Sequence, residues 1–127
     1  VPDPAEVDTV LLVEDVADNA RLFERVLKAY GFAVVRTEDA ASGFRTAVAV
    51  HPDIILVDLG LPDVDGLTLV SWLRRVPELS RTPIVALTAW PREIVKHMAE
   101  AYGCDGYISK PISATRFAHE VAEYLHR

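Results

Sequence analysis

The sequence predicts an α/β protein built on one open, doubly wound parallel sheet with helices on both faces. Short apolar runs alternate with longer segments of helical periodicity along the chain, which indicates repeated strand-helix units. Three of the apolar runs lack polar alternation, which is typical of strands buried on both faces of a parallel sheet. At 127 residues the chain is long enough for one domain with a single core.

Five short segments are predicted as strands. The first, third and fourth are uniformly apolar, the second contains a polar alternation, and the fifth is the shortest. Short connections and right-handed crossovers between such strands favour one sheet. The predicted strands are residues 9–13, 33–37, 54–57, 84–87 and 106–108.

Helices are predicted after each strand from apolar residues at helical spacing. Gly31 and Gly103 are placed to end the first and fourth helices, and Pro91 suits the first turn of the fourth. Ser113 is the expected N-cap of the last helix. The predicted apolar positions are Leu22, Phe23, Val26, Leu27 and Tyr30; Phe44, Ala47 and Val48; Leu69, Val70 and Leu73; Ile94, Val95, Met98, Ala101 and Tyr102; and Phe117, Val121 and Leu125.

The composition excludes several classes of protein. Thirteen Lys and Arg residues against nineteen Asp and Glu give a net charge of -6, which disfavours binding to nucleic acid or to anionic membranes. No apolar run approaches the ~20 residues of a spanning helix. A single cysteine, Cys104, excludes a disulfide framework and is compatible with a cytoplasmic location. Residues 1–6 are expected to form a flexible N-terminal segment, which leaves residues 7–127 as the domain.

Chemically reactive side chains follow four of the predicted strands. Glu14 and Asp15 follow the first strand, and Asp58, Thr88 and Lys110 follow the third, fourth and fifth. The carboxyl ends of parallel strands meet at one edge, where open α/β sheets bind ligands. Two carboxylates ~4 Å apart repel by about 4 kcal/mol at an effective dielectric constant near 20, so a counter-ion is required. One lysine supplies part of this charge, and a hard divalent cation such as Mg²⁺ suits the rest.

Acidic residues after strands also have a purely structural explanation, because they often start turns and cap helices. Asp63 and Asp65 in the segment LPDVDG are predicted to do so. The same explanation does not extend to reactive side chains that follow four separate strands.

Four segments carry a resemblance to a known family. They are LLVEDVADN at 11–19, DIILVDLGLPDVDG at 53–66, PIVALTA at 83–89 and GCDGYISKPI at 103–112. In order and spacing the chain resembles the receiver domain of two-component response regulators, from about Thr9 to His126. The resemblance implies a flavodoxin-like fold with strand order 2-1-3-4-5. It also implies a signalling protein that catalyses only its own phosphorylation and dephosphorylation.

The resemblance implies a role for each acidic residue. Asp58 is implied as the phospho-acceptor, whose carboxylate attacks a phosphohistidine and forms an aspartyl phosphate. Asp15 is implied as a direct Mg²⁺ ligand, together with Asp58 and the backbone carbonyl of Gly60. Glu14 is implied as a ligand that acts largely through water. The family often carries a larger side chain where this sequence has Gly60.

The remaining roles concern the phosphoryl group and the response to it. The Thr88 hydroxyl, the Ala89 N–H and Lys110 are implied to bind phosphoryl oxygens. The peptide bond between Lys110 and Pro111 is implied to be cis. Tyr107 is implied to be an aromatic switch that turns inward when Thr88 moves toward the phosphate. That movement would change the face formed by the fourth helix, the fifth strand and the fifth helix.

The implied partners are a sensor histidine kinase or a histidine phosphotransfer protein, and a downstream protein that binds the switched face. A receiver-like module that is never phosphorylated is the main alternative. An aspartate-nucleophile phosphatase of the haloacid-dehalogenase type is disfavoured, since Gly60 stands where that group needs a second Asp. A flavodoxin-type carrier is disfavoured because Glu14 and Asp15 would repel its phosphate. Whether the chain stands alone or is part of a hybrid kinase or longer regulator remains open.

Overall fold

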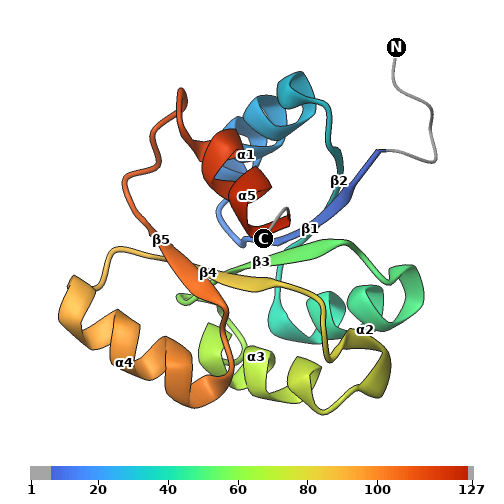
Figure 1. Cartoon of the computed structure of the whole chain (residues 1–127), viewed down its shortest axis with the longest axis vertical. Coiled ribbons are helices and arrows are strands. Elements are labelled where there is room, and N and C mark those ends of the chain that lie inside the picture. Colours follow the sequence, from blue (N-terminus) through green and yellow to red (C-terminus); the bar gives the residue numbers. More distant parts are fainter. Residues whose placement is uncertain (1–6, 126–127) are drawn as a thin grey trace.

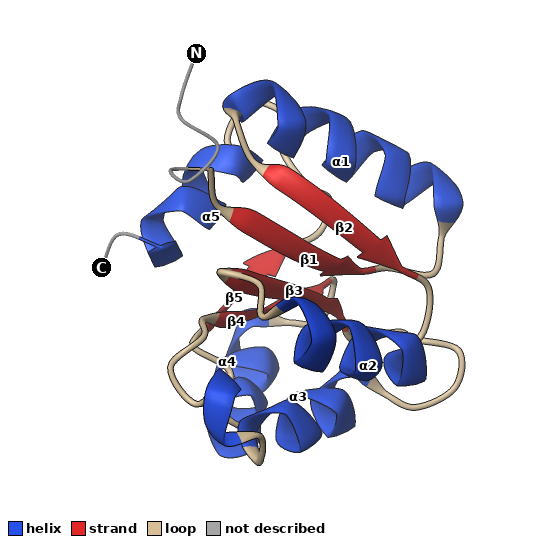
Figure 2. Cartoon of the chain, turned by 90° about the vertical axis from the view of Figure 1, so that its right-hand side faces the viewer, coloured by secondary structure: helices blue, strands red, loops and turns tan. Residues whose placement is uncertain are grey.

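The computed structural model describes residues 7–125 and shows a parallel sheet between two layers of helices (Figures 1 and 2). The strand order within these residues is β2-β1-β3-β4-β5, so the predicted doubly wound, flavodoxin-like fold is confirmed. The elements are β1 (Thr9–Val13), α1 (Ala17–Tyr30), β2 (Ala33–Thr37), α2 (Ala40–Val50), β3 (Ile54–Asp58), α3 (Gly66–Arg74), the short 3-10 helix η2 (Pro77–Leu79), β4 (Ile84–Thr88), α4 (Arg92–Tyr102), β5 (Gly106–Ser109) and α5 (Phe117–Leu125).

The register of the strands brings their carboxyl ends to one edge. β1 and β2 have their predicted bounds, while β3 and β4 are each one residue longer than the apolar runs and end on polar residues. The pairing between strands continues to these polar ends: Asp58 lies opposite Leu87, and Thr88 lies opposite Ser109. Two reactive side chains are thus fixed by the sheet itself rather than by a loop.

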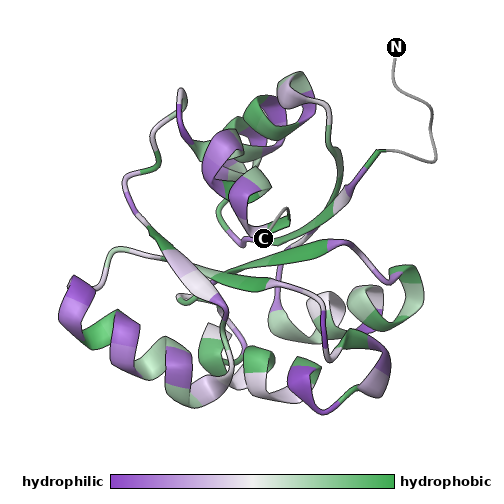
Figure 3. Ribbon diagram, in the orientation of Figure 1, coloured by the Kyte–Doolittle hydropathy of each residue, from purple (hydrophilic) through white to green (hydrophobic). Residues whose placement is uncertain are grey.

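The core lies on both faces of the sheet, as the unbroken apolar strands predict. Helices α1 and α5 cover one face, and α2, α3 and α4 cover the other (Figure 1). Successive residues of β1 alternate between the layers: Val10 and Leu12 pack under α1 and α5, while Leu11 and Val13 pack against the opposite layer. The inner strands form a largely hydrophobic band in Figure 3, whereas β5 is paler. This band forms the rigid support of the carboxyl edge.

Helix ends follow the local sequence. Gly31 and Gly103 adopt left-handed φ angles of 119° and 98° and end α1 and α4 as predicted. Asp65 caps α3 by accepting from the Thr68 N–H at 3.0 Å. Asp63 also caps a helix, but a distant one: its carboxylate accepts from two N–H groups at the start of α2, which ties the loop after β3 to that helix.

The predicted apolar faces of the helices are too wide. Leu22, Tyr30, Val48, Ile94 and Tyr102 belong to those faces, yet each is 39% exposed or more. The buried stripes are narrower and include small residues, such as Ala20 in α1 and Ala99 in α4. Hydrophobicity alone does not separate the centre of a helix face from its rim, because exposed apolar residues are common in folded proteins.

Two other local predictions differ from the structure. Pro91 is the N-cap of α4 rather than a residue of its first turn. Helix α5 begins at Phe117, and Ser113 opens the preceding turn through its carbonyl, which accepts from the N–H groups of Arg116 and Phe117. The Ser113 hydroxyl lies 3.2 Å from that of Thr115. The helix η2 was not predicted from the sequence.

Two predictions concern residues outside the described part of the chain. The flexible segment at residues 1–6 lies outside it, as do residues 126–127 at the end of the predicted domain. Both therefore stay predictions. Among the residues that are described, no helix combines the length and hydrophobicity needed to cross a bilayer.

Candidate functional site

Reactive side chains from four strand ends meet at the carboxyl edge of the sheet. One carboxylate oxygen each from Glu14, Asp15 and Asp58 lie within 4.8 Å of one another. Lys110 Nζ lies 3.0 Å from Asp58 Oδ2 and 3.7 Å from Glu14 Oε2. Thr88 ends the neighbouring strand β4. The structure thus brings together the three acidic residues and the lysine that the sequence analysis singled out.

A close approach of backbone to backbone holds the end of β3 in place. Helix α3 begins at Gly66, whose N–H donates to the Leu59 carbonyl at 3.3 Å. A Cβ at position 66 would lie 2.8 Å from Leu59 Cα, which real side chains do not tolerate. Only glycine therefore lets α3 start against the end of β3, and this contact fixes the loop that follows Asp58.

Asp58 is nearly buried, with 6% of its surface exposed, and its two oxygens have different partners. Oδ1 accepts from the Gly60 N–H at 2.9 Å, and Oδ2 accepts from Lys110 Nζ at 3.0 Å. Burial acts to raise the pKa of Asp58, but interactions with Glu14, the Gly60 N–H and Lys110 outweigh it and lower the pKa below its ordinary value. Asp58 is therefore ionised at neutral pH.

Glu14 has the opposite electrostatic environment. It is fully buried, and burial together with the neighbouring Asp58 raises the pKa of Glu14 from 4.5 to about 7. The Asn19 amide, 3.2 Å from Oε1, and the charge of Lys110 act in the other direction. Glu14 therefore retains its proton to a higher pH than an ordinary glutamate does.

Two buried carboxylate oxygens at this edge lack a hydrogen bond. Glu14 Oε2 and Asp15 Oδ1 are inaccessible to water and have no hydrogen-bond partner among the described residues. Buried polar atoms are almost always paired, so such a set requires an explanation. Several carboxylate oxygens close together are the donors that a small hard cation binds, and the residues present fit a Mg²⁺ ion.

Thr88 and the loops after β4 and β5 complete the edge. Thr88 is 3% exposed, and its hydroxyl oxygen accepts from the Trp90 N–H at 3.0 Å. Its carbonyl accepts from the Lys110 N–H at 2.8 Å, which fixes the start of the Lys110 loop against β4. Ala89 lies exposed between Thr88 and Trp90. The peptide bond between Lys110 and Pro111 is cis, as predicted.

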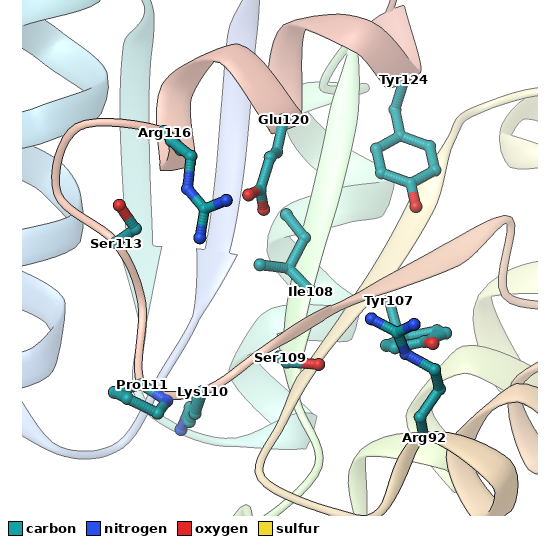
Figure 4. A pocket seen from close by; sticks show the side chains of 10 residues that line it. All are labelled: Arg92, Tyr107, Ile108, Ser109, Lys110, Pro111, Ser113, Arg116, Glu120 and Tyr124. Atoms are coloured by element: carbon teal, nitrogen blue, oxygen red, sulfur yellow. The ribbon is translucent and has the colours of Figure 1, made fainter.

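Tyr107 lies between this edge and a groove on the face formed by α4, β5 and α5. It sits opposite Ala86 of β4 and packs, half-buried, against a cluster that includes Leu59 and Val95. The groove has a volume of about 530 Å³. In Figure 4 the Arg92 side chain and the Tyr107 ring, which both line the groove, overlap in the view, and Lys110 lies near the end of β5. The groove and the acidic edge are therefore joined by only a few residues of β5.

Two residues that contact the acidic set were not predicted from the sequence. Asn19, in the first turn of α1, donates to Glu14. Arg36, at the end of β2, donates to the backbone carbonyls of Glu14 and Asp15. The sequence contained one signal for Arg36, since it is a lone charge inside the strand AVVRT. Asn19 carried no such signal.

A doubly wound sheet with an acidic edge and a facing lysine is the architecture of a phosphorelay signalling module. The family model described as the response regulator receiver domain matches residues 10–122, and the chain belongs to this family. Receiver domains are signalling modules of two-component systems, where they interact with histidine kinases or with downstream targets.

Known proteins agree with this assignment. The polar-differentiation response regulator DivK of Brucella ovis is 38% identical over 117 residues, which cover 92% of this chain and 95% of that protein. The receiver domain of a Pseudomonas aeruginosa sensor histidine kinase, solved with a magnesium ion coordinated in its active-site cleft, has a TM-score of 0.87 at 27% identity and covers 95% of this chain and 99% of its own. A chemotaxis response regulator of Vibrio cholerae shares the fold, with a TM-score of 0.89 at 24% identity, covering 94% of this chain and 99% of its own.

Proposed function

We propose that this receiver domain accepts a phosphoryl group on Asp58 from a phosphohistidine of a sensor histidine kinase or a histidine phosphotransfer protein. The observation that carries this proposal is the state of Asp58: its pKa is lowered, it is nearly buried, and it lies 3.0 Å from a lysine at an edge with unsatisfied oxygens. An ionised, positioned carboxylate beside a fixed positive charge is what a phosphoryl acceptor requires.

The reaction needs a nucleophile and groups that bear charge. An Asp58 oxygen forms a bond to phosphorus while the bond from phosphorus to the donor imidazole nitrogen breaks, and the electron pair stays on that nitrogen. Negative charge then spreads over the equatorial phosphoryl oxygens. Lys110 and the Ala89 N–H would stabilise this charge. Because the Thr88 hydroxyl oxygen accepts from Trp90, its hydrogen is available to donate to a phosphoryl oxygen.

The cofactor in this proposal is Mg²⁺. Asp15, Asp58 and the Gly60 carbonyl would bind it directly, and Glu14 would act largely through water. The ion, when bound, neutralises charge on the phosphoryl oxygens. A Cβ at position 60 would meet only Asp58 Oδ1, at an ordinary 3.7 Å, so the role assigned to Gly60 belongs to its carbonyl and does not depend on the absence of a side chain.

The proposal also includes the bounds of the domain, its partners and its location in the cell. Residues 7–127 form the receiver domain, and its partners are the phosphohistidine donor and a downstream protein on the α4-β5-α5 face, with no nucleic acid or membrane. A cytoplasmic location is expected for such partners, and the single free thiol of Cys104 is compatible with it. We assign no activity toward other substrates.

The test is the intact mass of the protein before and after exposure to acetyl phosphate or to a phosphohistidine donor. We expect one added phosphoryl group in Mg²⁺ and none in EDTA, and Asp58→Asn should not be labelled. Labelling of Asp58→Asn to the level of the wild type would reject the assignment of the acceptor. Absence of any labelling with Mg²⁺ would favour the receiver-like module that is never phosphorylated.

Mg²⁺ alone should raise the melting temperature of the unphosphorylated protein, because it relieves repulsion among Glu14, Asp15 and Asp58. A ligand at a hundredfold excess over its Kd stabilises the folded state by about 2.7 kcal/mol. Differential scanning fluorimetry across a MgCl₂ series measures the shift. In Asp15→Ala the shift should largely disappear, and an equal shift in this variant would argue against a cation at this edge.

Phosphorylation should change the environment of Tyr107. Movement of Thr88 toward the phosphoryl group would leave space for the ring to turn inward. Hydrogen exchange of residues 103–112 should slow or accelerate measurably when beryllofluoride and Mg²⁺ are added. Unchanged exchange and unchanged tyrosine fluorescence would leave Tyr107 as a structural residue of β5.

A further inference from the structure

Arg36 contacts the backbone of Glu14 and Asp15. It lies on β2 opposite Leu12 of β1. Its Nε donates to the Glu14 carbonyl at 3.1 Å, and one terminal nitrogen donates to the carbonyls of Glu14 at 2.9 Å and Asp15 at 3.2 Å. The Arg36 side chain is only 20% exposed, so water competes little for these bonds.

These bonds restrict the backbone on both sides of one residue. A peptide unit is planar, so fixing its carbonyl oxygen fixes the orientation of the whole plane. The carbonyls of Glu14 and Asp15 belong to the two peptide units that flank the Asp15 Cα. The Glu14 N–H is held as well, by the Thr37 carbonyl at 3.0 Å. The direction in which the Asp15 side chain leaves the backbone is therefore set by β2.

Asp15 depends on this support more than its acidic neighbours do. Glu14 is held by Asn19, and Asp58 is held by the Gly60 N–H and Lys110. Among the described residues, the Asp15 carboxylate accepts no hydrogen bond, and its Oδ1 is buried and unsatisfied. A carboxylate without side-chain partners has to be aimed by its own backbone.

We propose that Arg36 is a positioning residue of the cation site, which holds the Glu14-Asp15 backbone so that the Asp15 carboxylate is preorganised to bind Mg²⁺. This inference rests on the proposed function, because it presupposes a cation at that edge. Removing a group that orients a metal ligand through hydrogen bonds, without itself binding the metal, typically weakens metal binding by about 10- to 100-fold.

The direction of the change in Mg²⁺ affinity distinguishes a positioning role of Arg36 from an effect of its charge. A guanidinium near a cation site repels the cation, so removal of its charge alone would tighten Mg²⁺ binding. Loss of positioning would weaken it. Arg36→Gln removes both the positive charge and the guanidinium donors. Arg36→Lys keeps the charge, but its single ammonium group cannot donate to both carbonyls as the planar guanidinium does.

The experiment is calorimetric titration of the metal-free proteins with MgCl₂ alone, with the melting temperature of each measured in EDTA. Arg36→Gln should bind Mg²⁺ about tenfold more weakly than the wild type, and Arg36→Lys should also bind more weakly. Arg75→Gln, which removes an exposed arginine at the far end of α3, should bind as the wild type does. Glu38→Gln, which removes only the exposed ion pair of Arg36, should also leave the Kd unchanged.

Phosphorylation by acetyl phosphate gives a second readout. The initial rate in Arg36→Gln should fall at low Mg²⁺ and recover toward the wild-type rate at saturating Mg²⁺. An unchanged or tighter Kd in both Arg36 variants would overturn the inference, even if their melting temperatures fall. Should Arg36→Gln fail to fold, Arg36→Lys still tests the loss of positioning, with the charge retained. A wild type that binds no Mg²⁺ would overturn the proposed function along with this inference, whereas equal Kd values would overturn this inference alone.

Discussion

Lys110→Met should slow the phosphorylation of Asp58 by acetyl phosphate by about 10²- to 10³-fold, the usual cost of losing one preorganised donor to developing negative charge. Lys110 Nζ is 3.0 Å from Asp58 Oδ2, and its approach is fixed by the bond from its own N–H to the Thr88 carbonyl. Methionine keeps the unbranched side chain up to the ε position but lacks the ammonium group and its charge. The attacking carboxylate and the incoming phosphoryl group would then repel each other without compensation at that position.

The measurement is the initial rate of phosphorylation by intact mass, at saturating Mg²⁺. Lys28→Met is the matched control, because Lys28 is an exposed lysine in the last turn of α1 whose ion pair with Glu24 is on the surface. This control should react at the wild-type rate with a small-molecule donor. A Lys110→Met rate within twofold of the wild type would remove Lys110 from the mechanism.

Glu14→Gln should stabilise the metal-free protein at neutral pH. The folded state raises the pKa of Glu14 from 4.5 to about 7, so it binds an extra proton between these pH values. The stabilising contribution of that proton is fully present below about pH 4.5 and is lost progressively as the pH rises to about 7. Glutamine mimics the neutral form at every pH. The variant should therefore be more stable than the wild type by about 3 kcal/mol above pH 7, and about equally stable near pH 4.5.

Urea unfolding in EDTA at several pH values measures this difference, because the comparison between variants cancels the titration of groups that do not interact with Glu14. Glu123→Gln, a substitution of an exposed glutamate on α5, is the control and should show no such trend. A difference that stays flat between pH 5 and 8, or that grows toward acid pH, would show that Glu14 is not the residue that holds the proton.

The strand ends explain how far the sequence could predict the site. Uninterrupted apolar runs place β3 and β4 in the sheet interior, so Asp58 and Thr88 had to fall at their ends. A parallel sheet then gathers such ends at one edge whatever the loops do. The strand order itself was not readable from periodicity and came from the family resemblance.

What could not be predicted depends on side-chain reach and on neighbours. Asp63 was expected to cap a helix, but only the tertiary structure shows that this helix is α2. Arg36 could be seen as a charge in a strand, yet its bonds to the Glu14 and Asp15 carbonyls depend on the register of β1 and β2. Ile94 fits the apolar pattern of α4 but is 53% exposed, because the pattern does not say where the sheet ends.

A crystal structure with Mg²⁺ and beryllofluoride tests the central claim most directly, since that mimic occupies the position of the phosphoryl group. We predict the mimic on Asp58, with Lys110 and the Thr88 hydroxyl as its partners, and the cation among Asp15, Asp58 and the Gly60 carbonyl. Density showing the edge empty of both, or the three carboxylates directed away from one another, would contradict the account.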